Sequence, residues 1–160
     1  MLKKLSRFTA SSVVVALCFV LQLFSCNTKK SIDDISLEKS RADSIAGIYK
    51  SSIDSLISLR KYYHETGNDV GEMVVLKYLG QAYREDNKFI QAVALHNAEL
   101  KIATELCVTP AMIQALNNIG THHRRMGILD DASKFHFSAL NLCEKYSDKE
   151  SYRSKKNRVV

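Results

Sequence analysis

Histidine is the most versatile side chain for chemistry in this sequence, and His122, His123 and His136 stand close together in it. Neighbouring residues of a helix point about 100° apart, so His122 and His123 do not easily face one ion. No carboxylate follows His122 at the i+4 position to complete a ligand pair. A metal site is the alternative, but we expect imidazoles that pack as flat rings, and no metal.

Other catalytic patterns are incomplete. His64-Glu65 begins the H-E-x-x-H pattern of a zinc protease, but Thr66-Gly67-Asn68 follows and the second histidine is absent. The sequence has no nucleophile elbow, no glycine-rich phosphate loop and no local Ser/His/Asp signature. We therefore expect no catalytic residues, no cofactor and no enzymatic activity.

Two cysteines lie far from the N-terminus, Cys107 and Cys143. No CxxC pair occurs, and their spacing fits no metal motif. We expect two small buried thiols near helix ends, and a disulfide in an oxidising compartment is the alternative.

The N-terminus has the three parts of a secretory signal. Lys3, Lys4 and Arg7 are its charged part, Val13 to Leu23 is almost entirely apolar, and small Ser25 precedes Cys26. The string Leu23-Phe24-Ser25-Cys26 resembles a bacterial lipobox, in which the cysteine is lipidated and becomes the new N-terminus. We expect a membrane-anchored lipoprotein on the extracytoplasmic side, with an uncleaved anchor helix as the alternative.

Charge favours neither nucleic acid nor a bilayer as a partner of the remaining chain. The formal net charge of the chain is +6, and the predicted signal carries three of those positive charges and no acid. The rest is nearly balanced, which gives no electrostatic argument for nucleic acid. The basic run from Arg153 to Arg158 is interpreted as a solvated face.

Periodicity divides the mature chain. Residues 26–40 are polar and charged, which is typical of a flexible tether. Residues 41–66 place apolar side chains at helical spacing and predict one helix, which Gly67-Asn68 ends.

Sliding the chain on itself by 40 residues reveals an internal repeat. The matched pairs are Leu76/Leu116, Leu79/Ile119, Gly80/Gly120, Phe89/Leu129, Ala92/Ala132, His96/His136 and Leu100/Leu140. Asp69 falls on Thr109 as helix-start chemistry, and Asp69 with Glu72 also has the spacing of a capping box. Asn87 falls on Gly127, and both types accept the left-handed conformation that ends a helix. Two helix–turn–helix units follow, at 69–107 and 109–147, and residues 148–160 are expected to start an incomplete further helix.

The strings LKYLGQAYREDNKFIQAVALHNAEL and LNNIGTHHRRMGILDDASKFHFSAL resemble the tetratricopeptide repeat (TPR) in its longer form. The resemblance implies an all-α class and a short α-solenoid of TPR-like helix–turn–helix repeats. It places Gly80 and Gly120 where the two helices of a unit approach most closely, with Ala92 and Ala132 opposite them. His123 and His136 then take positions that aromatic packing residues usually fill. The sequence departs from the family with Asn87 in place of glycine, Glu99 in place of alanine and His123 in place of tyrosine.

The resemblance also implies an inner face lined by the first helix of each unit. Six residues occupy matching places there: Lys77, Gln81 and Arg84, and then Asn117, Thr121 and Arg124. Residues at i, i+4 and i+7 share one helical stripe. Basic and amide groups on such a face suit a peptide or protein partner, through hydrogen bonds and charge pairing. The alternative is that they are ordinary exposed helix residues.

The sequence therefore predicts a membrane-tethered protein-interaction module whose partner is a protein or peptide. The rival is the sensory extracytoplasmic segment of a bacterial signalling regulator or sensor kinase. Because repeats bury their apolar faces on neighbouring units, we also expect self-association through the open C-terminal end.

Overall fold

The computed structural model describes residues 31–157, with side-chain surroundings for residues 31–147. The chain divides into two compact units, Met1–Ile35 and Ser36–Val160. The first unit contributes only the start of α2 to the described residues. The helices are α2 (Ile32–Ile48), α3 (Ile53–Glu65), α4 (Asp69–Glu85), α5 (Phe89–Glu105), α6 (Thr109–Arg125) and α7 (Leu129–Asn157).

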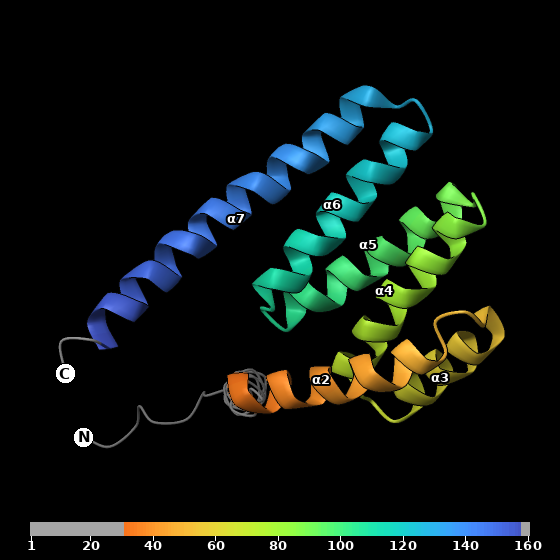
Figure 1. The fold of residues 1–160 in the computed structure, drawn as a ribbon, viewed down its shortest axis with the longest axis horizontal. Helices are drawn as coiled ribbons and strands as arrows, with labels where there is room; N and C mark the ends of the chain where they lie inside the picture. The colour runs from red at the N-terminus through yellow and green to blue at the C-terminus, as the bar shows by residue number, and fades with distance from the viewer. Residues whose placement is uncertain (1–30, 158–160) are drawn as a thin grey trace, which may run out of the picture. The chain divides into compact units, whose positions relative to one another are not determined.

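Consecutive helices pack side by side in the second unit: α3 on α4, α4 on α5, α5 on α6, and α6 on α7 (Figure 1). No strand occurs within residues 31–157. This arrangement confirms the all-α, solenoid-like fold class. Within the same range, none of the helices combines the length and the apolar character needed to cross a membrane.

The core is centred on α4, which packs against both the preceding and the following helix. The segment from Val70 to Leu76 is buried on all sides, and Leu79 is buried one turn later. Leu56 and Tyr63 of α3 cover one side. Most of the stability of such a helix comes from this burial rather than from intrinsic propensity.

Four helices end with the same backbone motif, spaced 20 residues apart. The residues after the last turns, Gly67, Asn87, Cys107 and Gly127, all have positive φ, between 57° and 79°. In each turn the amide three residues after the helix end donates back to a carbonyl in the last turn, as Asn68 N does to Tyr63 O at 2.8 Å. This is the Schellman motif. Three of these residues are glycine or asparagine, whereas Cys107 has no such conformational preference.

Two helix starts differ from the sequence-based expectation by one residue. Asn68, not Asp69, is the N-cap of α4, and its Oδ1 accepts from Gly71 N at 2.7 Å. Glu72 therefore closes no capping box, because its carboxylate faces α3. Thr109 is the first residue of α6, and Val108 precedes it as an N-cap without a side-chain bond.

The structure corrects the expected segments before the repeats. The tether expected over 26–40 is helical from Ile32, while its earlier part lies outside the described residues. The single helix expected over 41–66 is two helices, because Ser52 N-caps α3 and its hydroxyl accepts from Ser55 N at 3.3 Å. An N-cap hydroxyl replaces an intrahelical bond and so favours a new start there.

The expected further helix over 148–160 is also corrected. The helix α7 continues without a break through Ser147 to Asn157. No glycine or proline occurs between Gly127 and the C-terminus, so the two residue types that most strongly end a helix are absent there.

Candidate functional site

The two repeated glycines lie where the helices of each pair cross. A methyl group added at Gly80 would clash with the His96 ring of α5. A methyl group at Gly120 would lie 3.0 Å from the His136 ring and 3.1 Å from the carbonyl oxygen of Ala132. Ala92 and Ala132 are both buried at the same crossings. The structural repeat positions therefore allow the first and second helices of each unit to approach closely.

A third close crossing joins α3 to α4, and the sequence comparison did not reveal it. A methyl group at Gly71 would lie 2.5 Å from Tyr63 Cδ1. Beside it, Glu72 is 6% exposed and accepts from Arg60 Nε at 3.2 Å and pairs with His64 Nδ1 at 2.8 Å. Burying a carboxylate is tolerated only when it is paired in this way. The pair of His64 and Glu72 thus connects α3 to α4.

The first row of the expected binding residues lies on α4, and its members differ in how far their side chains are exposed and paired. Lys77 is paired with Asp43 of α2 and is 13% exposed at its side chain. Its ammonium also lies 4.4 Å from the centroid of the Tyr78 ring. Gln81 is half-buried, and Arg84 keeps 42% of its side chain exposed.

The second row lies on α6. Arg124 is exposed, and Thr121 bonds its hydroxyl to the backbone oxygen of Asn117 at 2.9 Å. The amide oxygen of Asn117 also pairs with His136 Nδ1 of α7 at 2.9 Å. The structure thus keeps Gln81, Arg84, Thr121 and Arg124 accessible in two rows, while Lys77 and Asn117 already have side-chain partners.

A buried polar cluster lies behind the rows. His96 Nδ1 is 2.7 Å from the Glu99 carboxylate, and both side chains are 1% exposed. The ring of His122 stacks on His96 with centroids 5.2 Å apart. Burial raises the pKa of Glu99, although the His96 hydrogen bond opposes the rise. Glu99, which departs from the family's alanine, is therefore accommodated by an imidazole from its own helix.

His122 is held neutral in this cluster. Within the described residues neither of its ring nitrogens has a hydrogen-bond partner. Burial is the largest cause that lowers its pKa from 6.5 to about 4, and the charges of His96, Arg84 and His123 contribute to this shift in that order. Unlike His122, His123 keeps a bond, between Nδ1 and Ile119 O at 2.9 Å.

The helices α6 and α7 border an open hollow of ≈ 430 Å³. Its lining matches two helical stripes: Pro110, Ile113, Gln114 and Asn117, and then His136, Ala139, Leu140 and Cys143. Leu140 is 54% exposed there.

The cysteine expectation is corrected in one respect. Cys107 and Cys143 are both exposed rather than buried, and neither forms a disulfide in the part of the chain that the structure describes. Cys107 is exposed because it occupies the turn after α5. Cys143 is exposed because it borders the hollow between α6 and α7. Cys26, the expected lipidation site, lies outside the described residues.

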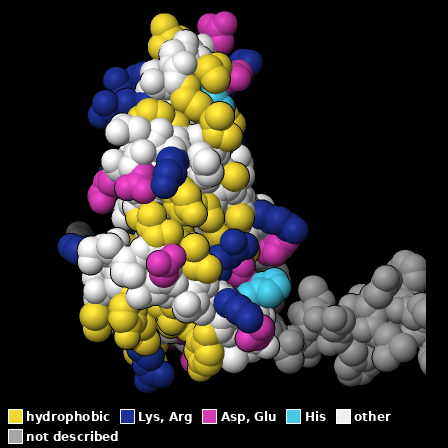
Figure 2. All heavy atoms as spheres, turned by 90° about the vertical axis from the view of Figure 1, so that its right-hand side faces the viewer, with side chains coloured by type: hydrophobic (Ala, Val, Ile, Leu, Met, Phe, Trp, Pro, Cys, Tyr) yellow, Lys and Arg dark blue, Asp and Glu magenta, His cyan; other side chains and the backbone are white. Residues whose placement is uncertain are grey.

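The surface is chemically mixed. In Figure 2 hydrophobic side chains run through the visible face, and basic and acidic side chains lie scattered among them without forming one large patch of charge. Within residues 31–147, no three His, Cys, Asp or Glu side chains converge as metal ligands. Comparison with protein-family models, curated proteins and solved structures finds no match.

Proposed function

We propose that this chain is a TPR-like protein-interaction module, tethered to the extracytoplasmic side of a bacterial membrane through a lipid on Cys26. The observation that carries the proposal is the pair of polar rows on α4 and α6, which repeat in register and remain partly accessible. The module uses no cofactor and catalyses nothing. Its partner is a protein or peptide, not nucleic acid.

The chemistry of the rows favours an acidic partner. Arg84 and Arg124 present guanidinium groups, which bind carboxylates through two parallel hydrogen bonds. Gln81 and Thr121 add neutral donors and acceptors between them. Lys77 already binds a carboxylate within the chain, that of Asp43. A negatively charged segment laid across the rows would gain the same kind of contact.

The test replaces the two accessible arginines, Arg84→Glu and Arg124→Glu, in one chain. Lys77 is left in place because its replacement would also disturb α2. The wild-type and variant chains are used to capture the native partner from solubilised membranes, and the captured proteins are compared by quantitative mass spectrometry. We expect the specific partner to be lost from the variant by tenfold or more, with unchanged helicity.

A matched control changes charge elsewhere by the same amount. Lys101→Glu and Lys145→Glu reverse two charges at exposed positions outside the rows. This control should capture the partner at the wild-type level. Equal capture by the Arg84/Arg124 variant and the wild type would contradict a binding role for the rows.

Lipidation has its own test. Each buried methylene contributes about 0.8 kcal/mol to membrane binding, so two or more acyl chains hold a small domain firmly. Mass spectrometry should find acylated Cys26 as the first residue of the mature chain. A Cys26→Ala chain that remains in the membrane at the wild-type level would indicate an uncleaved anchor helix instead.

A second candidate is the sensory extracytoplasmic segment of a bacterial signalling regulator or sensor kinase. It is favoured by α7, which continues as one helix of 29 residues, whereas α4, α5 and α6 have 17 residues each. A continuous helix is a rigid connector between a binding face and a distant element. Partner binding that changes hydrogen exchange in α7 beyond Ser147 would support this candidate, and unchanged exchange would argue against it.

A further inference from the structure

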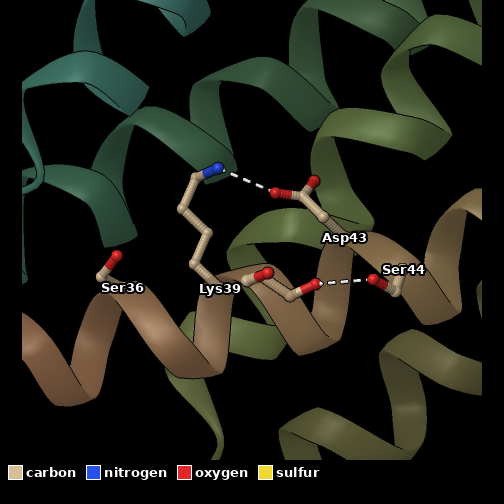
Figure 3. A pocket seen from close by; sticks show the side chains of 5 residues that line it. Ser36, Lys39, Asp43 and Ser44 are labelled. Carbon is tan, nitrogen blue, oxygen red and sulfur yellow. Dashed lines mark hydrogen bonds and ion pairs between the residues drawn. The ribbon is translucent and has the colours of Figure 1, made fainter.

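The inner face of the first unit is already partly occupied, by α2 of the same chain. The carboxylate of Asp43 pairs with Lys77 of the first row and with Lys39 one turn earlier on α2, the latter at 2.8 Å (Figure 3). Burial raises the pKa of Asp43, but the hydrogen bonds and charges of the two lysines outweigh that effect and lower it. The carboxylate is therefore held charged between two cations.

The helix approaches α4 through small side chains. Ala42 and Ala46 are 2% and 0% exposed, and both belong to the core cluster that contains Val74, one turn before Lys77. A methyl group added at Gly47 would lie 3.7 Å from Tyr78 Oη, in ordinary contact. Two buried alanines four residues apart thus join α2 to the core, and Asp43 between them reaches Lys77.

The larger apolar side chains of α2 take no part in this contact. Leu37, Ile45 and Ile48 are 54%, 40% and 74% exposed. Hydrophobic stabilisation scales with the apolar area removed from water. A helix that fully buries two alanines and leaves most of its larger apolar side chains exposed is held less firmly than α4. A competing helix can therefore displace α2 from its contact with Lys77.

We propose that the inner face binds a helix that presents a carboxylate between small residues four apart, and that α2 is the resident example of this ligand. The proposal deepens the proposed function, on which it rests, by naming the class of partner. A helix of this class would displace α2 from Lys77. It would also meet Gln81 and Arg84, which lie farther along the same row.

The probe is a fluorescein-labelled peptide that copies residues 36–50, and binding is measured by fluorescence anisotropy with the full chain. In the wild type the chain's own α2 competes. Ala42→Arg places a long charged side chain in the close contact and should release α2. We expect the peptide to bind the Ala42→Arg chain at least tenfold more tightly than the wild type.

Ser44→Arg is the matched control, because it adds the same side chain at an exposed position of α2. It should bind the peptide like the wild type. Equal peptide affinity for the wild-type and Ala42→Arg chains would overturn the proposal, as would tight binding by the Ser44→Arg control.

A charge exchange tests the class of ligand. Adding Lys77→Glu to the Ala42→Arg chain should reduce peptide binding at least tenfold, and a peptide with Asp43→Lys should restore it. Failure of the exchanged pair to restore binding would overturn the role of the carboxylate. Helicity of each chain, followed by circular dichroism, shows that α4–α7 stay folded. The proposed function fails separately, if native-partner capture is unaffected by Arg84→Glu and Arg124→Glu.

Discussion

Acid should destabilise this protein through His122, and the size of the effect follows from its surroundings. The side chain is 1% exposed, and its pKa falls from 6.5 to about 4 on folding. The unfolded chain therefore binds a proton at this residue more readily than the folded chain does. A difference of one pKa unit corresponds to about 1.4 kcal/mol, so the full shift is on the order of 3 kcal/mol.

The sign follows from the direction of the shift. Above pH 6.5 the residue is neutral in both states and contributes nothing to pH dependence. As the pH falls from 6.5 toward 4, the unfolded state gains the proton first, and the free energy of unfolding decreases. Glu99 acts in the opposite sense, because its raised pKa lets the folded state bind a proton before the unfolded state does. The wild-type curve therefore contains both contributions.

Comparison with His122→Phe isolates the histidine. Phenylalanine keeps a flat ring against His96 and Phe89 and removes the two unpaired nitrogens. Urea unfolding at a series of pH values between about 7.5 and 4.5 should show wild-type stability falling relative to this variant by about 2–3 kcal/mol. The control His123→Phe retains His122, so its free energy of unfolding should fall with pH as that of the wild type does. Parallel curves for wild type and His122→Phe would refute the reasoning, as would an NMR titration of His122 near 6.5.

Three further predictions concern the turns, the crossings and the open end. Cys107→Gly should raise the free energy of unfolding in urea by about 1 kcal/mol, because glycine adopts positive φ without the cost that a side chain carries. The control Cys143→Gly, within α7, should lower the free energy of unfolding by a similar amount. Equal effects of the two substitutions would contradict the prediction. Gly120→Leu should overpack the crossing of α6 and α7 at a cost of about 1–3 kcal/mol, and an unchanged thermal melt would show that the crossing is looser than described. Self-association through the hollow between α6 and α7 should appear in sedimentation experiments as an average mass that increases with protein concentration. Leu140→Glu should suppress this increase. A wild-type chain that stays monomeric at all concentrations would exclude self-association.

The repeated part of the fold was accessible from sequence because its signals are strong and local. The 40-residue register aligned Gly80 with Gly120 and His96 with His136, and both glycines lie against those histidines. Two of the turns were visible as Asn87 and Gly127, residue types that accept positive φ. Cys107 carries no such signal, so the turn after α5 could be located only through its neighbours in the repeat.

The start of α2 before residue 41 and its separation from α3 were missed for a different physical reason. Pattern reasoning assumes that large apolar residues point inward, and in α2 the inward residues are Ala42 and Ala46 while Leu37 and Ile48 face solvent. Glu72 was misassigned because its spacing from Asp69 imitates a capping box. Its true partners, Arg60 and His64, lie on the preceding helix and have no fixed sequence separation from it.

Two periods coexist in this chain, and they have different consequences. Helix ends recur every 20 residues, from Gly67 through Gly127, so the four helices from α3 to α6 end with the same backbone motif. The glycine–imidazole crossings recur every 40 residues, at Gly80 and Gly120, so only every second helix is turned toward the inner face. The proposed binding surface therefore has one row for each pair of helices, on α4 and on α6. Because α2 engages Lys77 of the first row, the row on α6 is the one offered without a resident occupant, and Arg124 is the residue at which an incoming acidic partner is expected to make its first contact.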